Sequence, residues 1–176
     1  MLKKILWGIG IAVILFSAYI VYILATTRNH SPAATATITS NGTTISIDYC
    51  RPFKKDRVIF GELLPYGQYW RTGANEPTLI KLDKAVSIGG KTVEAGNYRL
   101  YTIPDEKEWT VALNTELEKW GYYEPDYSLD VLRMKVPVEN LSSVQEQFLI
   151  DIQKSAEGAE VHFAWDRTKV RLPIKI

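Results

Sequence analysis

The sequence is short of the residues that most often build crosslinks and metal sites. Its 176 residues include one cysteine, Cys50, and only two histidines, His30 and His162. A lone cysteine excludes a disulfide within the chain, and so few Cys and His ligands argue against a structural zinc site. Cys50 lies in a strand-like stretch, where a free cysteine is usually a small buried apolar residue. We therefore predict no metal site and no reactive thiol.

Other common functional signatures are missing as well. Neither the G-x-x-x-x-G-K-[ST] nor the G-x-G-x-x-G pattern occurs, so nothing indicates nucleotide binding, and we expect no cofactor. The first 30 residues contain three basic residues and no acidic one, which leaves 18 basic against 20 acidic residues in the rest of the chain. This balance does not provide the basic stripe that a nucleic-acid binder needs. We predict no nucleic-acid partner.

Charge is also absent from residues 5–27, where Ile, Leu, Val, Ala and Phe dominate. A helix of about 20 such residues crosses a hydrocarbon core of about 30 Å. Lys3 and Lys4, which precede the run, favour an N-terminus in the cytoplasm. We predict a cytoplasmic tip at 1–4, a single-pass transmembrane anchor at 5–27, and a domain on the extracytoplasmic side, which is periplasmic if the cell is Gram-negative.

Two other interpretations of this apolar run stay open. A cleaved signal peptide would end in small residues, and Ala34 and Ala36 provide an A-x-A arrangement, although the run exceeds the usual ~7–15 residues. A helix in the core of the domain would have to bury apolar side chains all the way round. We expect an uncleaved anchor that contacts the lipid bilayer.

The rest of the chain carries strand signals separated by turn dipeptides. Thr43–Cys50 alternates apolar and polar residues, which is typical of a half-buried strand. Asn41-Gly42 before it favours a type I′ hairpin turn, and Gly89-Gly90 marks a second tight turn. These patterns predict antiparallel strands joined by short connections.

The number and spacing of the strands predict the fold class. We expect a linker at 28–37 and a single domain at 38–176, which is all-β, a β-sandwich or open barrel of about nine short strands. Thr115–Trp120 is the only stretch of the domain that suggests a helical turn. The predicted strand segments are Ala36–Ser40, Thr43–Cys50, Thr78–Leu82, Val86–Ile88, Thr92–Val93, Tyr98–Ile103, Trp109–Leu113, Val131–Val138, Gln147–Gln153, Ala159–Trp165 and Val170–Ile174.

Residues 51–77 do not fit the strand pattern. Connections longer than about 12–15 residues are usually functional or disordered, and the many large apolar side chains here argue against disorder. Within this segment the run W-R-T-G-A-N-E at 70–76 combines an aromatic ring, a guanidinium, an amide and a carboxylate. Such groups bind sugars, carboxylates or peptide backbone. The same groups could instead satisfy the loop itself, with Trp70 in the core.

We predict that this run forms one hydrogen-bonded cluster with Arg71 at its centre, paired with Glu76. Arginine suits that role because its guanidinium offers five donors in a fixed fork. A neighbouring cleft, if one exists, should be lined by Tyr66, Trp70 and Asn75. The candidate ligand-binding residues are therefore Tyr66, Trp70, Arg71, Asn75 and Glu76, and no catalytic residue is proposed.

A second aromatic stretch, Trp120-Gly121-Tyr122-Tyr123 with Tyr127 beyond it, has two interpretations. It could line a binding surface, since exposed aromatic patches often mark interaction sites. It could also cover a sheet edge. Trp109 and Trp165, in contrast, lie inside strand-like runs and are expected in the core.

Several short motifs carry a family resemblance across residues 36–176. They are Tyr49-Cys50-Arg51-Pro52, Arg57-Val58-Ile59-Phe60-Gly61, Leu64-Pro65-Tyr66-Gly67, the 70–76 run, Ala95-Gly96-Asn97-Tyr98, Ile103-Pro104, Trp109, Asn114 and Trp165. With these motifs the chain resembles the bacterial family catalogued as domain of unknown function 2911. The resemblance implies an exported or envelope-located β domain and no established activity. Cys50 stands where the family's pattern leads us to expect serine, a change between small residues.

Three hypotheses about function follow. The preferred one is a non-enzymatic, membrane-tethered module of the cell envelope that binds a glycan, a peptide or an envelope protein. The first rival is a hydrolase that uses carboxylates in or near residues 51–77, and the second is a purely structural envelope subunit. An open cleft with two facing carboxylates would favour the hydrolase, an open cleft without them the binding module, and filled space the structural subunit. The sequence indicates no oligomeric state.

Overall fold

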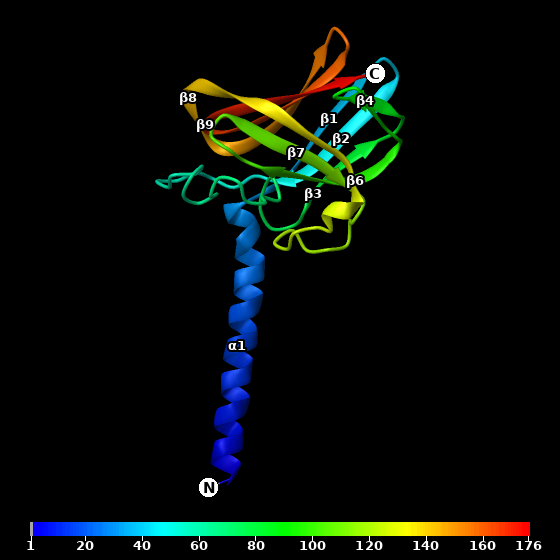
Figure 1. Cartoon of the computed structure of the whole chain (residues 1–176). Helices are drawn as coiled ribbons and strands as arrows, with labels where there is room; N and C mark the ends of the chain where they lie inside the picture. The colour runs from blue at the N-terminus through cyan, green and yellow to red at the C-terminus, as the bar shows by residue number, and fades with distance from the viewer. Residues whose placement is uncertain (1) are drawn as a thin grey trace.

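A computed structural model describes residues 2–176 as one long helix followed by a β domain (Figure 1). Helix α1, Leu2–His30, projects away from the domain, and only Ser31 and Pro32 separate it from the first strand. Its segment Leu6–His30 is long and apolar enough to cross a membrane. The described side chains of this segment lie largely exposed, which is the expected environment for a lipid-facing helix.

The domain is built from nine antiparallel strands, which confirms the all-β prediction. They form one continuous sheet in the order β1-β2-β3-β6-β7-β8-β9-β4-β5. The strands are β1 Ala33–Ser40, β2 Thr43–Cys50, β3 Thr78–Leu82, β4 Val86–Ile88, β5 Lys91–Val93, β6 Gly96–Ile103, β7 Glu108–Asn114, β8 Asp130–Ser155 and β9 Gly158–Lys175.

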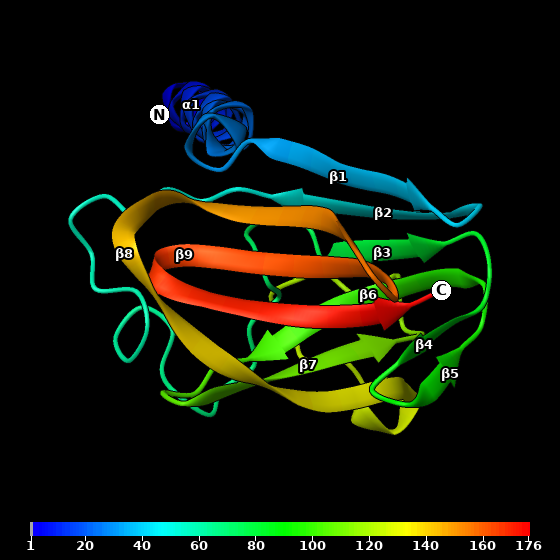
Figure 2. The ribbon, with the colours of Figure 1, turned by 90° about the horizontal axis from the view of Figure 1, so that it is seen from above.

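The sheet folds over on itself into two layers because β8 takes part in both. Its first part pairs with β7, from Asp130 to Pro137, and its second part pairs with β9, from Val138 to Ser155. Figure 2 shows β9 and the second part of β8 lying across β2, β3 and β6. The apolar side chains between these two layers form the core.

The structure differs from the predicted elements in three places. The segments Val131–Val138 and Gln147–Gln153, predicted as two strands, belong to the single strand β8, and Ala159–Trp165 and Val170–Ile174 belong to the single strand β9. The pairing between β8 and β9 shifts register where the sequence suggests a break. The predicted linker at 28–37 contains the end of α1 and much of β1. The helical turn predicted at Thr115–Trp120 is wrong: a 3-10 turn, η1, lies instead at Tyr127–Leu129, capped by Asp126, whose side chain accepts from the Ser128 N–H.

Aromatic side chains fill the middle of the core. The rings of Trp70 and Trp165 stack with centroids 5.7 Å apart, and Phe148 meets Trp70 at 4.9 Å. Trp109 packs against Phe60 at 5.0 Å. The expectation that Trp109 and Trp165 are core residues is confirmed, since both are buried.

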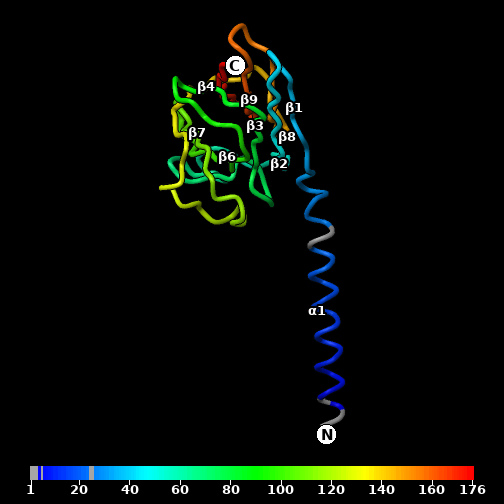
Figure 3. Tube along the Cα trace, turned by 90° about the vertical axis from the view of Figure 1, so that its right-hand side faces the viewer, coloured from blue at the N-terminus to red at the C-terminus, as the bar shows by residue number. Residues whose placement is uncertain are grey.

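Two long loops occupy the side of the domain from which α1 projects. These are residues 51–77, between β2 and β3, and residues 115–129, between β7 and β8. Figures 1 and 3 agree that the 115–129 loop reaches past the C-terminal end of α1, to the level of its last turns.

Candidate functional site

The loop at 51–77 is ordered because its backbone pairs with strands at both ends. The Phe148 N–H donates to the Pro52 carbonyl at 2.9 Å, so the chain just beyond β2 lies along β8. Further on, Trp70 and Thr102 exchange two backbone hydrogen bonds of 2.8 and 2.9 Å. The loop is thus held to both layers of the domain.

The 70–76 run turns sharply and uses its own small residues to do so. Thr72 has a φ of 56° and its hydroxyl donates to Thr102 Oγ1 at 3.0 Å. A Cβ atom at Gly73 would lie 2.9 Å from the Cys50 carbonyl oxygen, so only glycine fits there. Trp70 Nε1 donates to the Gly73 carbonyl at 3.0 Å, which fixes the buried ring.

The predicted pair between Arg71 and Glu76 is wrong. Glu76 instead accepts from Arg28, at the end of α1, with Nη2 and Oε1 2.8 Å apart. Its other oxygen accepts from the Cys50 thiol at 3.2 Å. Arg71 forms no hydrogen bond or ion pair with any described residue, because the turn at Thr72 and Gly73 directs the two ends of the run to different partners.

Glu76 and Cys50 border a hollow of about 530 Å³ between the end of α1 and the β1–β2 hairpin. Burial alone would raise the pKa of the Glu76 carboxyl, but hydrogen bonds from its own backbone, from Cys50 and from Arg28 outweigh burial and lower it. Burial and the Glu76 carboxylate raise the pKa of the Cys50 thiol. Cys50 is buried, as predicted, but it is also a protonated hydrogen-bond donor, which the sequence did not indicate.

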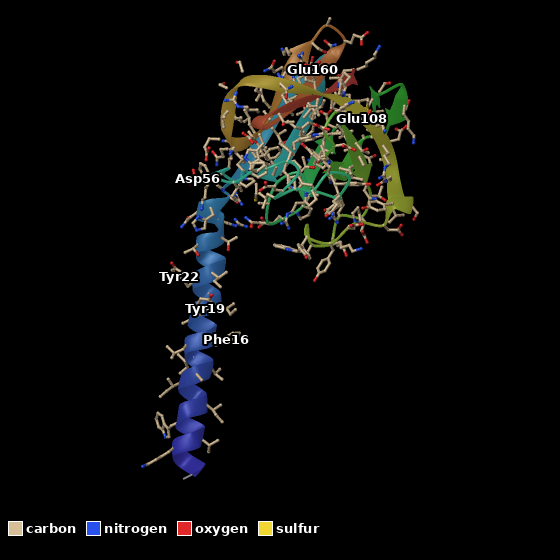
Figure 4. The ribbon with its side chains drawn as sticks, turned by 60° about the vertical axis from the view of Figure 1, so that its left-hand side comes forward. Phe16, Tyr19, Tyr22, Asp56, Glu108 and Glu160 are labelled. Atoms are coloured by element: carbon tan, nitrogen blue, oxygen red, sulfur yellow. The ribbon has the colours of Figure 1, made fainter. Side chains whose placement is uncertain are left out.

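A different cleft, of about 430 Å³, opens beside Trp70 and Arg71 and is called the Arg71 cleft here. No Asp or Glu is among its described lining residues, although exposed Asp56 lies in the same loop. Figure 4 places Asp56 close to the end of α1, and Glu108 and Glu160 on the strands farther from it. The lining is apolar and basic: His30, Ser31, Pro52, Phe53, Lys55, Arg57, Leu63, Leu64, Trp70, Arg71, Gly73, Ala74 and Trp165.

The charge in the Arg71 cleft is only partly compensated by the protein. The Arg57 guanidinium donates to the carbonyls of Phe53 and Lys54. Arg71 is half-buried, and burial lowers the pKa of its guanidinium, while no carboxylate opposes that effect. The indole Nε1 of Trp165 is buried and also has no acceptor among the described residues. Donors in and beside this cleft therefore lack partners.

The other candidate residues lie outside the Arg71 cleft. Tyr66 is exposed and covers Gly61, where an added Cβ would lie 3.2 Å from the tyrosine ring. Asn75, with a φ of 58°, is 3.5 Å from the Ser31 carbonyl oxygen. Of the five candidates the structure brings only Trp70 and Arg71 into one cleft, and Glu76 lines the other hollow.

The buried arginine at the centre of a hydrogen-bond network is Arg99 on β6, which the sequence analysis missed. Its side chain is fully buried, and it donates to the Tyr123 carbonyl at 2.5 Å and to the carbonyls of Lys119 and Gly121, both at 3.4 Å. It also donates to the hydroxyl of Tyr69, which itself donates to the Gly121 carbonyl at 2.8 Å. The only signal in the sequence is a charged residue between Tyr98 and Leu100 within a strand.

The comparison with protein families assigns the domain. The family described as "Protein of unknown function (DUF2911)" matches residues 31–174. The chain belongs to this family. The match begins at Ser31, directly after α1, and ends within β9, so it spans the β domain and leaves α1 outside. No curated protein and no solved structure matches the chain.

Metal binding finds no support in the part of the DUF2911 chain that the structure describes. No group of three or more His, Cys, Asp or Glu side chains there could hold a metal ion. Asp126 is used as a cap of η1, and Asp130 accepts from Tyr101 at 2.6 Å and from Asn114 at 2.8 Å. These carboxylates are engaged in holding the 115–129 loop.

Proposed function

We propose that this DUF2911 protein is a membrane-anchored binding domain of the cell envelope, and that its ligand combines an anionic group with an apolar or aromatic part. The anchor is α1, with its N-terminus in the cytoplasm and the domain outside. The lysines that precede the apolar run support this orientation, and the short connection from α1 to β1 supports a domain held close to the membrane.

The observation that carries the proposal is the unpaired guanidinium of Arg71. Removing a cation from water is costly unless a partner compensates it, and the described lining of the cleft contains no carboxylate. A carboxylate, phosphate or sulfate group placed there would accept a bidentate pair of hydrogen bonds from the guanidinium. Lys55 and Arg57, also on the lining, add two more positive charges.

The apolar part of the ligand is inferred from the rest of the lining. Phe53, Leu63 and Leu64 border the cleft together with the rings of Trp70 and Trp165. Among the partners expected from the sequence, this combination fits an acidic glycan or a carboxylate-bearing peptide better than a neutral sugar. A cleft that excludes water on its apolar side would also strengthen the ionic contact.

The two rival functions have weaker support. Carboxylates of Asp48 and Glu76 do line the second hollow, yet Asp48 accepts from Thr35 at 2.5 Å and the pKa of Glu76 is lowered. A general acid needs a raised pKa to hold a proton near neutral pH. A purely structural role does not account for an open cleft with an unpaired cation.

The test is a pair of probes that differ in charge but not in shape. 2-Naphthoate is anionic, and 2-naphthamide is its neutral counterpart; both are titrated calorimetrically into the full chain in lipid nanodiscs. Arg71→Gln should weaken naphthoate binding about 10- to 100-fold, since a hydrogen bond to a charged group contributes about 1.5–3 kcal/mol. Binding of the amide should be almost unchanged.

The matched control is Arg171→Gln, which removes an exposed arginine on β9 that is not among the residues lining the cleft. This variant should bind both probes like the wild type. Equal naphthoate affinity of the wild type and Arg71→Gln would contradict the proposal, and so would failure of the wild type to bind either probe.

A further inference from the structure

The aromatic stretch of the 115–129 loop is held rigidly while its side chains stay exposed. Trp120 is 52% exposed, Tyr122 71% and Tyr123 58%. Isolated exposed rings are common, but three within four residues form a patch that needs an explanation.

The backbone beneath this patch is fixed by the most buried charge of the domain. Arg99 donates to the carbonyls of Lys119, Gly121 and Tyr123, which belong to the backbone that carries the exposed rings. A Cβ atom at Gly121 would lie 2.9 Å from both the Asn75 carbonyl oxygen and the Pro77 nitrogen. The loop is therefore pressed against the 71–77 segment, and its rings are displayed by a pre-organised backbone.

The position of the patch relative to α1 indicates which kind of partner the patch can meet. In Figures 1 and 3 the 115–129 loop extends toward the N-terminus of α1, to the level of the last helical turns. Only Ser31 and Pro32 connect α1 to β1, and two residues span at most about 7 Å. If α1 crosses a bilayer, the loop is brought to the lipid headgroup layer beside it.

From these observations we infer that the 115–129 loop docks on the bilayer, with Trp120, Tyr122 and Tyr123 inserted at the interface between headgroups and acyl chains. This inference rests on the proposed membrane anchor but not on the Arg71 cleft. Trp and Tyr favour this layer because each ring has an apolar body and a polar tip. The 51–77 loop, on the same side of the domain, also carries exposed apolar residues: Val58, Leu63 and Tyr66.

The charges of the loop indicate that docking depends on the rings and not on anionic lipid. Three of its carboxylates have partners within the loop: Glu116 accepts from the Asp126 N–H, Asp126 from Ser128, and Glu124 from Tyr127. A basic surface would bind anionic lipid, but this loop carries more acidic than basic residues. Vesicles of phosphatidylcholine alone should therefore suffice.

The test uses Trp120 as a fluorescent reporter in the full chain. The protein has five tryptophans, of which Trp70, Trp109 and Trp165 are buried and Trp7 lies in α1. A Trp7→Phe variant, which leaves Trp120 as the exposed reporter, is reconstituted into phosphatidylcholine vesicles with acyl chains brominated near the headgroup. Bromine quenches indole on contact. We expect clear quenching that is lost in Trp7→Phe/Trp120→Phe.

The control places a tryptophan at the opposite end of the domain. Ala156 lies in the exposed β8–β9 turn, and in Figures 1 and 3 this hairpin points away from α1. Adding Ala156→Trp to the double variant should restore fluorescence without restoring quenching.

Two results would overturn the inference, and they are distinguishable. In the first result, the protein floats with the vesicles after an alkaline wash, but Trp7→Phe and Trp7→Phe/Trp120→Phe are quenched equally. That result would contradict the docking and leave the proposed anchor intact. In the second result, the protein does not float with the vesicles, which would contradict both the proposed anchor and the docking.

Discussion

Arg71 and Arg99 both lie against Gly121, yet their surroundings are opposite. Arg99 is fully buried, and both of its Nη atoms donate to carbonyl groups or to the Tyr69 hydroxyl, although its Nε has no acceptor among the described residues. Arg71 is half-buried, contacts the Gly121 position through its Cδ atom, and has no acceptor among the described residues. The difference indicates that one arginine holds the structure together and the other is available to a ligand.

The comparison is tested most strongly at Arg99. Arg99→Met keeps much of the volume but leaves buried carbonyls without donors, and each such group costs about 1–3 kcal/mol. We expect a loss of about 3 kcal/mol or more, which corresponds to a fall of about 10 °C in Tm for a domain of this size. Thermal melts of the full chain in nanodiscs, followed by circular dichroism, measure it.

Arg171→Met is the matched control for this prediction. Arg171 also lies on a strand, but it is exposed and pairs with Glu139 at 2.6 Å. A surface pair contributes at most about 1 kcal/mol. If the Tm of Arg99→Met were no lower than that of Arg171→Met, the hydrogen bonds of Arg99 would not stabilise the domain.

A smaller effect is expected at Glu76, which links the domain to the end of α1. Its pKa is lowered in the folded state, so its contribution to stability is present above the ordinary carboxyl pKa and is lost as the pH falls through the lowered value. Glu76→Gln should therefore reduce stability at neutral pH by less than about 1 kcal/mol, because the pair with Arg28 is exposed.

The measurement is the pH dependence of Tm between neutral and acidic conditions. Wild type and Glu76→Gln should differ at neutral pH and converge once the Glu76 carboxyl is protonated. A constant difference across that range would show that the carboxylate charge is not what stabilises the contact.

Much of the fold followed from local sequence patterns. Alternation in Thr43–Cys50 and the Asn41-Gly42 turn predicted the first hairpin, and the structure has both. The continuity of β8 was missed because its register shifts at Asn140 and Gln145 look like a turn in the sequence, and only the partner strand shows that pairing resumes.

The candidate site was predicted less well, because it depends on contacts far apart in the chain. Proximity in sequence suggested that Arg71 pairs with Glu76, but the turn at Thr72 and Gly73 separates them. Glu76 meets Arg28, 48 positions away, and Arg99 meets Tyr123, 24 positions away. No local pattern encodes such partners.

The central claim is that Arg71 is kept for an anionic ligand while Arg99 is structural. The decisive measurement is the Tm of wild type, Arg71→Met and Arg99→Met in nanodiscs, each with and without 2-naphthoate. A ligand that binds only the folded state raises Tm. We predict that Arg71→Met has the Tm of the wild type and that naphthoate does not raise it. Arg99→Met should have a lower Tm, which naphthoate raises as much as it raises that of the wild type. Arg71→Met melting as low as Arg99→Met, with the naphthoate gain intact, would contradict the account.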